Sequence, residues 1–161
     1  QQFRKKYVNS LLRDFPKIPI ISDREIFLKV VDLGEKLVEL HLLKNSSLSL
    51  ISEYPIPGNN LIKQVAYEEH EHRIYVNTDQ YFSNISKEIW DFKIGSYTLV
   101  KKWLETKMKT YLTSQDVDTF QKIVNMIHIT KTLQKKIDDI FPSILDNIVK
   151  INTNTQNLDA F

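Results

Sequence analysis

The chain has 161 residues, of which 42% are hydrophobic and 26% are charged, with a formal net charge of +2. These values are ordinary for a globular domain and argue against a disordered chain, while the small net charge argues against a self-sufficient nucleic-acid binder. The absence of cysteine excludes disulfides, thiolate metal sites and cysteine nucleophiles, and favours the reducing cytoplasm. No apolar run approaches the roughly 20 residues that span a bilayer, so membrane insertion is not predicted.

Two amphipathic helices are predicted in the first third of the chain. Apolar residues recur at helical spacing over residues 3–14, and the prolines that follow end this first helix. Residues 22–25 (Ser-Asp-Arg-Glu) have the form of a capping box, and an apolar repeat with steps of four and three predicts a helix from there to about residue 43. Gly34 lies inside this helix, where we expect close packing against another helix.

A loop and a β-hairpin are predicted next. Residues 45–60 are rich in Ser, Asn, Pro and Gly, which is typical of a surface loop. Apolar residues then alternate over residues 62–67 and 74–76, on either side of the charged stretch 68–72. This pattern predicts two strands joined by a solvated turn.

Helices are predicted for most of the second half. Ser86 is expected to cap a short helix that runs through Trp90, and Gly95 to break the chain before an apolar stripe over residues 97–104 that predicts another helix. The last long helix is expected to begin at Thr113 or Ser114 and to end at Pro142. A further short helix over residues 144–148 is then expected.

The order of these elements predicts a mostly helical α+β fold, a helical bundle with a small antiparallel β-hairpin or sheet inserted between helices. We expect one domain over residues 1–150 and a polar, frayed tail over residues 151–161. Because the chain opens on Gln1 without an initiating Met and directly in a predicted helix, we expect it to be part of a longer protein.

Basic side chains gather in two places. Residues 1–17 hold five basic side chains against one acidic, and residues 101–109 hold four lysines against one glutamate. Such stretches are suited to phosphate contacts, although solvated helix faces often carry similar charge.

Catalytic and metal chemistry find little support. Three or four converging ligands would be needed for a metal. His70 and His72 lie in a predicted charged turn with Glu68 nearby, which a solvated turn explains better, and the other histidines fall on separate helices. The only glycines are Gly34, Gly58 and Gly95, so no phosphate-binding or dinucleotide-binding glycine motif is present. The sequence therefore predicts no catalytic, metal or cofactor site in this chain.

The stretch Gly95-Ser96-Tyr97 is the one unusual local feature. A glycine before a lysine-bearing helix allows a turn that exposes backbone amides at the helix start, where a phosphate could bind. In the alternative interpretation, Gly95 only permits the turn, while Tyr97 and Trp103 fill the core.

The segment Trp90-Asp91-Phe92-Lys93-Ile94-Gly95-Ser96-Tyr97, followed by Val100-Lys101-Lys102-Trp103-Leu104, resembles the signature of the C-terminal specificity domains of type ISP restriction-modification enzymes. Further agreement lies in residues 13–19, 33–35, 40–43, 74–77 and 81–82, so the resemblance spans roughly residues 3–137. The chain departs from the family pattern at Ser96, where a second glycine is usual, and at Thr98, where a glutamine is usual.

The resemblance implies a DNA target-recognition domain that binds duplex DNA and positions it for the parent enzyme. The parent would be a cytoplasmic, adenine-specific DNA methyltransferase that uses S-adenosylmethionine, in some members with endonuclease and helicase domains, and its upstream methyltransferase domain would be the partner of this fragment. No catalytic residue is carried over, and no cofactor is expected in the fragment. The candidate DNA-contacting residues are Lys101, Lys102, Lys107, Lys109, Ser96, Tyr97, Arg4, Lys5 and Arg13.

Two other functions compete with this interpretation. A structural coupler would dock the methyltransferase core without reading DNA, through the Gly34 helix and the long C-terminal helix. A free-standing enzyme would have to use the histidines and Tyr97.

Overall fold

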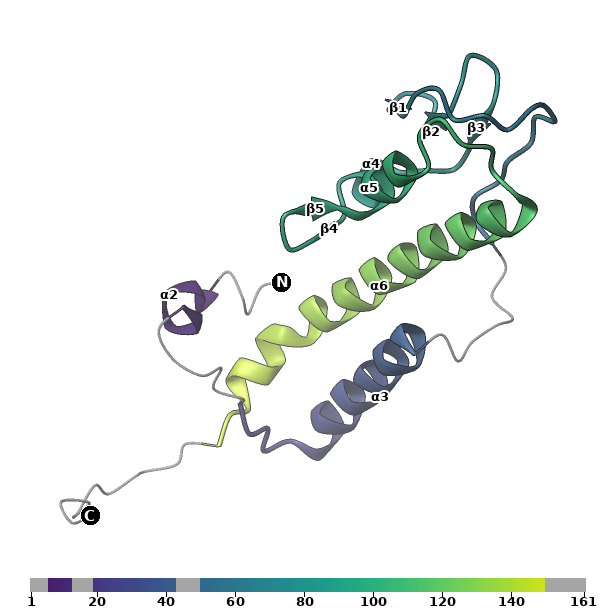
Figure 1. The fold of residues 1–161 in the computed structure, drawn as a ribbon. Helices are drawn as coiled ribbons and strands as arrows, with labels where there is room; N and C mark the ends of the chain where they lie inside the picture. The colour runs from purple at the N-terminus through teal and green to yellow at the C-terminus, as the bar shows by residue number, and fades with distance from the viewer. Residues whose placement is uncertain (1–5, 13–18, 43–49, 150–161) are drawn as a thin grey trace, which may run out of the picture. The chain divides into compact units, whose positions relative to one another are not determined.

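The computed structural model describes residues 6–12, 19–42 and 50–149. In chain order its elements are α2 (Val8–Leu11), α3 (Arg24–His41), β1 (Ala66–Glu68), β2 (Arg73–Tyr75), β3 (Tyr81–Phe82), α4 (Lys87–Trp90), β4 (Lys93–Ile94), β5 (Tyr97–Thr98), α5 (Leu99–Thr106) and α6 (Ser114–Asp146) (Figure 1). The chain divides into two compact units, one of residues 39–132 and one of residues 1–38 with 133–161. The mostly helical α+β fold class is confirmed; the single domain over residues 1–150 stays a prediction.

The unit of residues 39–132 is built on a three-stranded antiparallel sheet in the order β1-β2-β3. Tyr67 lies opposite Ile74, and Ile74 lies opposite Phe82. The alternation of apolar residues correctly predicted the β1–β2 hairpin, whose turn falls on the charged residues 69–72. The third strand, β3, was not predicted from the periodicity because two residues are too few to show a period.

A continuous apolar core fills this unit. It joins the sheet to α4, α5 and the first half of α6, and its fully buried members include Ile62, Ile74, Phe82, Leu104 and Phe120. The Phe82 and Phe120 rings lie 4.1 Å apart at their centroids, which ties the sheet to α6 directly. Burial of such large side chains contributes about 1.5–3 kcal/mol each, so this cluster holds the unit together.

A buried amide network fixes the loop before the sheet. Gln80 is 2% exposed, and its Nε2 donates to the Ile56 carbonyl at 2.9 Å and to Asn60 Oδ1 at 2.8 Å. Its Oε1 accepts from the Asn60 backbone N–H at 2.8 Å and from Asn77 Nδ2 at 2.9 Å. The polar atoms of the Gln80 amide are therefore satisfied, and residues 56–60, predicted as a loop, take a defined course without a regular element.

The unit of residues 1–38 with 133–161 contains α2, most of α3 and the end of α6. An isolated antiparallel bridge pairs Ile21 with Ile148, and Val149 N–H donates to the Ile20 carbonyl at 2.8 Å. Asp23 Oδ1 accepts from the backbone N–H groups of Glu25 and Ile26 at 2.8 and 2.9 Å, so Asp23 caps α3. The predicted cap, Ser22, donates instead from its hydroxyl to the Asn147 carbonyl at 3.0 Å.

Two expectations for the helices are wrong. Apart from the adjacent residues and the backbone of α3 itself, no described atom lies within 4 Å of a Cβ built on Gly34, so close packing against another element does not explain this glycine. Pro142 does not end the last helix, because α6 continues through it to Asp146, and Phe141 and Ile144 on either side are buried. Apolar burial here outweighs the hydrogen bond that the proline cannot donate.

Several predicted features fall outside the described residues. They are the end of the first helix, the start of the 45–60 loop and the tail at residues 151–161. Over the described part of the chain, no helix is both long and apolar enough to cross a membrane.

Candidate nucleic-acid interface

A short hairpin precedes the lysine-bearing helix α5. Strands β4 and β5 pair antiparallel, with Ile94 opposite Tyr97 and Lys93 opposite Thr98. Gly95 has a φ of 60°, and Ser96 does not share this left-handed conformation. A two-residue loop with Gly at its first position and positive φ there has the signature of a type II′ turn, which suits the twist of a hairpin.

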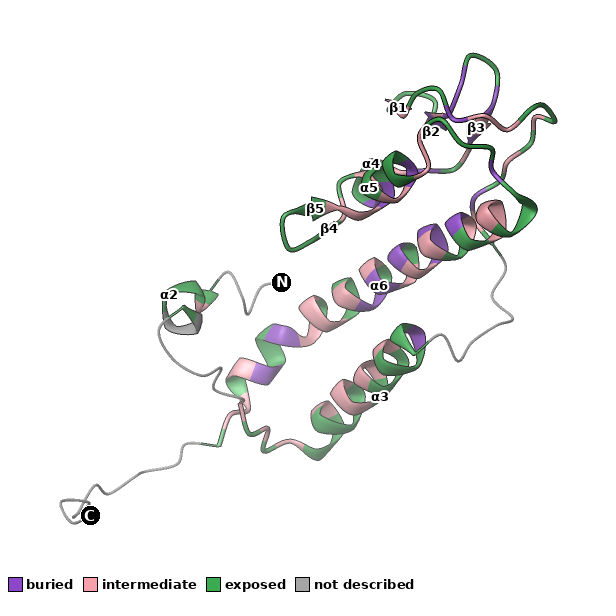
Figure 2. Ribbon diagram, in the orientation of Figure 1, coloured by how far each residue is buried: buried purple, intermediate pink, exposed green. Residues whose placement is uncertain are grey.

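The base of the hairpin is anchored in the core while its tip is exposed. Phe92 and Leu99 pack against the buried cluster, and Leu99 N–H donates to the Phe92 carbonyl at 3.0 Å. Residues 93–97 are all exposed, as the green tip in Figure 2 shows. The hairpin is thus held at one end and presented to solvent at the other.

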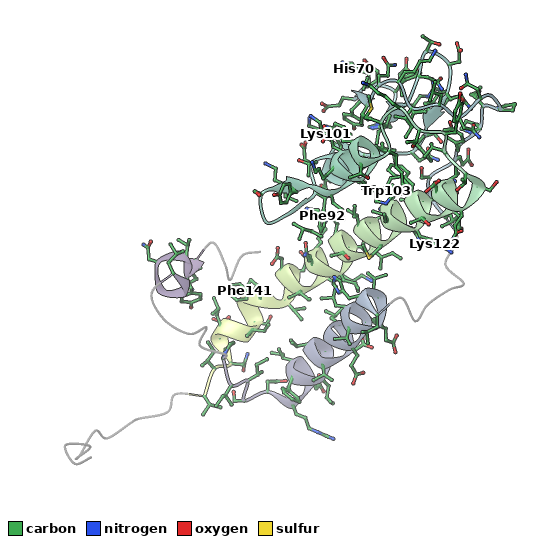
Figure 3. The ribbon with its side chains drawn as sticks, viewed as in Figure 1. His70, Phe92, Lys101, Trp103, Lys122 and Phe141 are labelled. Atoms are coloured by element: carbon green, nitrogen blue, oxygen red, sulfur yellow. The ribbon has the colours of Figure 1, made fainter. Side chains whose placement is uncertain are left out.

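Helix α5 separates an apolar face from a basic one. Val100 and Leu104 are buried one turn apart, and the half-buried Trp103 ring lies 5.4 Å from the Phe120 ring of α6. Lys101 and Lys102 are exposed, and Figure 3 shows Lys101 on the side of α5 away from α6. This orientation follows from the helical period, because burying positions 100, 103 and 104 leaves 101 and 102 in solvent.

The local charge around the hairpin is positive, with one marginal ion pair among the described residues. Lys101 Nζ is 3.9 Å from Glu105 Oε1, at the limit of an ion pair, and neither Lys93 nor Lys102 has an ion-pair partner among the described residues. The first turn of α5 contains no acidic side chain. Lysines there add to the positive end of the helix dipole, so the segment attracts anions.

Lys107 has a different role from its neighbours. Its Nζ lies 2.8 Å from Asp116 Oδ1 and 5.7 Å from the centroid of the Trp103 ring. Thr113 and Asp116 form a reciprocal cap at the start of α6, because Asp116 N–H donates to Thr113 Oγ1 at 3.1 Å and Thr113 N–H donates to Asp116 Oδ2 at 3.0 Å. Hydrogen bonds from Lys107, and then from Thr113, lower the pKa of Asp116 to about 2.

The other predicted site residues are dispersed. Lys109 is exposed with a φ of 65°, and its backbone N–H donates to the Ile62 carbonyl, so it lies in the connection between α5 and α6. Arg4, Lys5 and Arg13 lie outside the described residues. The structure therefore brings Ser96, Tyr97, Lys101 and Lys102 together on consecutive elements and leaves Lys107 and Lys109 beyond the end of α5.

Both interpretations of Gly95-Ser96-Tyr97 need correction. The glycine turns a hairpin and does not begin a helix, and the Leu99 N–H at the start of α5 is already bonded to the Phe92 carbonyl. Tyr97 belongs to β5 and is 63% exposed, so it is not on the helical stripe and does not fill the core. Trp103 does pack against the core, as expected.

Lys93 and Ile94 were missed as site candidates. Both are exposed on β4, and Ile94 faces Tyr97 across the turn. The sequence did contain a hairpin pattern, because the dipeptides Lys93-Ile94 and Tyr97-Thr98, each with one apolar residue, flank Gly95-Ser96. This pattern was missed because Tyr97 was assigned to the apolar stripe of the helix predicted over residues 97–104.

The charged turn at residues 69–72 is solvated. His70 and His72 are exposed, and Glu71 accepts from the Tyr75 hydroxyl at 2.7 Å and from Arg73 at 2.9 Å, which lowers the Glu71 pKa. Within the described ranges, no group of three or more His, Asp or Glu side chains is arranged to hold a metal ion.

A groove of about 460 Å³ lies between residues 54–60 and the start of α6. Its wall includes Tyr54, whose hydroxyl is buried without a hydrogen-bond partner in the described structure and whose pKa is raised to about 12 by burial. Asp118 in the same wall is paired with Lys122 at 2.6 Å. These groups do not form an acid–base pair.

The chain belongs to the family of type ISP C-terminal specificity domains, because the sequence pattern of that family matches residues 1–137. No curated protein sequence matches the chain.

Two solved structures share its fold. One is a nuclease-deletion mutant of the type ISP restriction-modification enzyme LlaGI in complex with a DNA substrate mimic, with a TM-score of 0.58, 17% identity and coverage of 84% of this chain. The other is the ATP-dependent type ISP enzyme LlaBIII bound to DNA, with a TM-score of 0.53, 15% identity and coverage of 93% of this chain. The match covers 12% and 10% of those two chains, respectively.

Proposed function

We propose that this chain is the DNA target-recognition domain of a restriction-modification enzyme and that it binds duplex DNA and positions it for the rest of that enzyme. The observation that carries the proposal is the family match over residues 1–137. The two neighbours in fold are type ISP enzymes whose structures hold DNA or a DNA mimic, which supports the same role.

In this proposal, the lysines of the hairpin and α5 contact the DNA backbone. Lys93, Lys101 and Lys102 are exposed, and no acidic residue occurs between positions 92 and 104. Contacts of this kind fix the register of a protein on the duplex but carry no sequence information. Lys107 is a weaker candidate because Asp116 already neutralises it.

The chemistry would belong to the parent chain. We infer an upstream adenine-specific methyltransferase domain that uses S-adenosylmethionine, in a cytoplasmic enzyme with nuclease and helicase domains where the parent carries them. The specificity domain over residues 1–150 would act as one recognition module without a catalytic group of its own.

The salt dependence of duplex binding tests the proposal. The double substitution Lys101→Ala with Lys102→Ala should flatten the slope of log affinity against log salt by about 1.8, because each lost phosphate contact accounts for about 0.9. Lys122→Ala controls for the loss of a lysine elsewhere in the unit, since Lys122 is paired with Asp118 at 2.6 Å and Figure 3 shows it on the side of α6 away from α5. The control should retain the slope of the unchanged chain; equal slopes for all three proteins would exclude phosphate contacts at α5.

A second candidate function, coupling to the parent enzyme without reading DNA, is favoured by one face of α3. Phe27 and Val38 are 49% and 58% exposed, and with Val31 and Gly34 they recur at steps of four and three. The stripe predicted from the sequence, from Ile26 to Leu40, is the more buried side of the same helix. An exposed apolar stripe is typical of a docking surface.

Two measurements separate the candidates. A coupler would bind the upstream domain, would lose that binding on Phe27→Glu or Val38→Glu, and would shift no duplex in a gel at low salt. Duplex binding that survives both substitutions would instead support target recognition.

A further inference from the structure

The tip of the β4–β5 hairpin carries an exposed apolar pair. Ile94 is 58% and Tyr97 is 63% exposed, and the two lie directly opposite each other in the register. Because side chains alternate between the faces of a strand, Ile94 and Tyr97 share one face and Lys93 and Thr98 share the other. The tip thus presents a compact apolar surface beside a lysine.

This apolar pair does little for the stability of the unit. Single exposed apolar residues are common, but neither member of this pair is among the residues packed against the core. Two-stranded hairpins are marginal in isolation, so this one depends on its base, where Phe92 and Leu99 are anchored. The fold therefore holds an isoleucine and a tyrosine in solvent at a defined position.

Charge identifies the occupant of this surface. Lys93 lies on the same hairpin, Lys101 and Lys102 lie in the first turn of the following helix, and Asp91 just before the hairpin is paired with Lys87 at 3.6 Å. Of these three lysines, only Lys101 has a carboxylate within 4 Å among the described residues. An apolar tip beside them suits a ligand that is anionic outside and apolar inside. Duplex DNA has this character, since base faces and thymine methyl groups lie within a phosphate envelope.

We propose that the β4–β5 hairpin is the base-reading element of the domain, in which Ile94 and Tyr97 contact bases while Lys93, Lys101 and Lys102 hold the flanking backbone. The proposal rests on the proposed DNA-binding function. It assigns sequence discrimination to the two uncharged residues and affinity to the lysines.

Selection of binding sites from a pool of randomised duplexes tests this division. The unchanged chain and the variants Tyr97→Ala, Ile94→Ala, Tyr97→Phe and Lys102→Ala are each used to recover duplexes, and their affinities for the recovered site and for the unselected pool are measured over a range of salt. Tyr111→Ala is the matched control, because Tyr111 is 66% exposed in the same unit but lies outside the hairpin. Thermal unfolding of every variant identifies any that fails to fold.

Tyr97→Ala and Ile94→Ala should lower the ratio of site to pool affinity, by roughly tenfold for Tyr97, with an unchanged salt slope, because they remove base contacts and no charge. Lys102→Ala should weaken both affinities alike and flatten the slope. Tyr97→Phe and Tyr111→Ala should retain the discrimination.

A recovered site that Tyr97→Ala and Ile94→Ala still prefer as strongly as the unchanged chain does would overturn the hairpin assignment alone. Loss of discrimination in Tyr111→Ala to the same extent would also overturn it. Failure of the unchanged chain to bind duplexes or to enrich any site would overturn the proposed function, and the hairpin assignment with it.

Discussion

Lysines 101, 102, 107 and 109 carry the same charge in different surroundings. Lys101 and Lys102 extend into solvent from α5, whereas Lys107 is 2.8 Å from Asp116 and Lys109 adopts a left-handed backbone conformation. A charge that is already paired gains less from a phosphate, since it must first leave its partner. The interaction of the domain with an anion is therefore expected to depend on individual lysines rather than on their number.

The contribution of the Asp116 carboxylate to the stability of the fold is expected to depend on pH. Its pKa falls from an ordinary 3.8 to about 2 through hydrogen bonds from Lys107 and Thr113. A group with a lowered pKa stabilises the fold fully above its ordinary pKa and loses that contribution as the pH falls toward 2. Compared with the unchanged chain, Asp116→Asn should be less stable at pH 6, and the difference should shrink between pH 4 and 2.

Unfolding by urea at a series of pH values measures this difference, and Asp79→Asn, at an exposed carboxylate away from the start of α6, is the control. Two parallel pH profiles for Asp116→Asn and the unchanged chain would contradict the assignment.

Two glycines should respond oppositely to the same substitution. A Cβ on Gly58 would lie 2.7 Å from Gln80 Cδ, in a side chain held by four hydrogen bonds, so Gly58→Ala should destabilise by about 1–3 kcal/mol. A Cβ on Gly34 would meet no described atom outside the backbone of α3 and the adjacent residues, so Gly34→Ala should stabilise α3 by up to about 1 kcal/mol. Urea unfolding of both variants tests the pair, and effects of the same sign would be inconsistent with this packing.

At the scale of elements, α6 shows how tertiary packing overrides a local signal. Pro142 lies within the helix, and the turn beyond it is secured where Asn147 Nδ2 donates to the Ser143 carbonyl at 2.9 Å and the Asn147 carbonyl accepts from Ser22 N–H at 2.8 Å. The segment is thus tied to residues far away in the sequence.

Replacement of this proline should stabilise the protein. An interior proline destabilises a helix by about 3 kcal/mol. It also makes the unfolded chain less flexible, which stabilises the folded protein by about 0.4–1 kcal/mol. The free energy of unfolding of Pro142→Ala should therefore be higher than that of the unchanged chain by roughly 2 kcal/mol. Ser143→Ala, one residue along, is the control for a change at this position in the chain. A lower unfolding temperature for Pro142→Ala than for Ser143→Ala would show that the proline is needed where it is.

The elements predicted correctly from the sequence are those with a long or capped pattern. Local sequence patterns correctly predicted three features. They are the periodic helix α3, the Ser86 cap of α4 and the β1–β2 hairpin. The β4–β5 hairpin was not predicted, because Tyr97 continues the apolar spacing of α5, and only burial decides whether it belongs to the helix or to a strand. For the same reason the sequence could not reveal that Lys107 is paired, since Asp116 approaches it from the next helix.

At the scale of the whole molecule, the formal net charge of +2 says little about where an anion would bind. Acidic and basic residues nearly balance overall, yet the segment from residue 92 to 104 has lysines and no carboxylate. The chain matches 12% and 10% of two type ISP enzymes with the same fold, and in the proposed function the reaction chemistry belongs to a parent protein. Its own contribution would be the choice of DNA site.

In the proposed function, duplex DNA binds at the β4–β5 hairpin and α5. The most direct test is a titration of the ¹⁵N-labelled chain with duplex DNA at low salt, in which NMR records the chemical shifts of the backbone amides. We predict that the largest changes fall on residues 93–102 and disappear as salt is raised. Saturable binding with the changes confined to α3 or to the end of α6, and none over residues 93–102, would contradict DNA binding at the hairpin and α5.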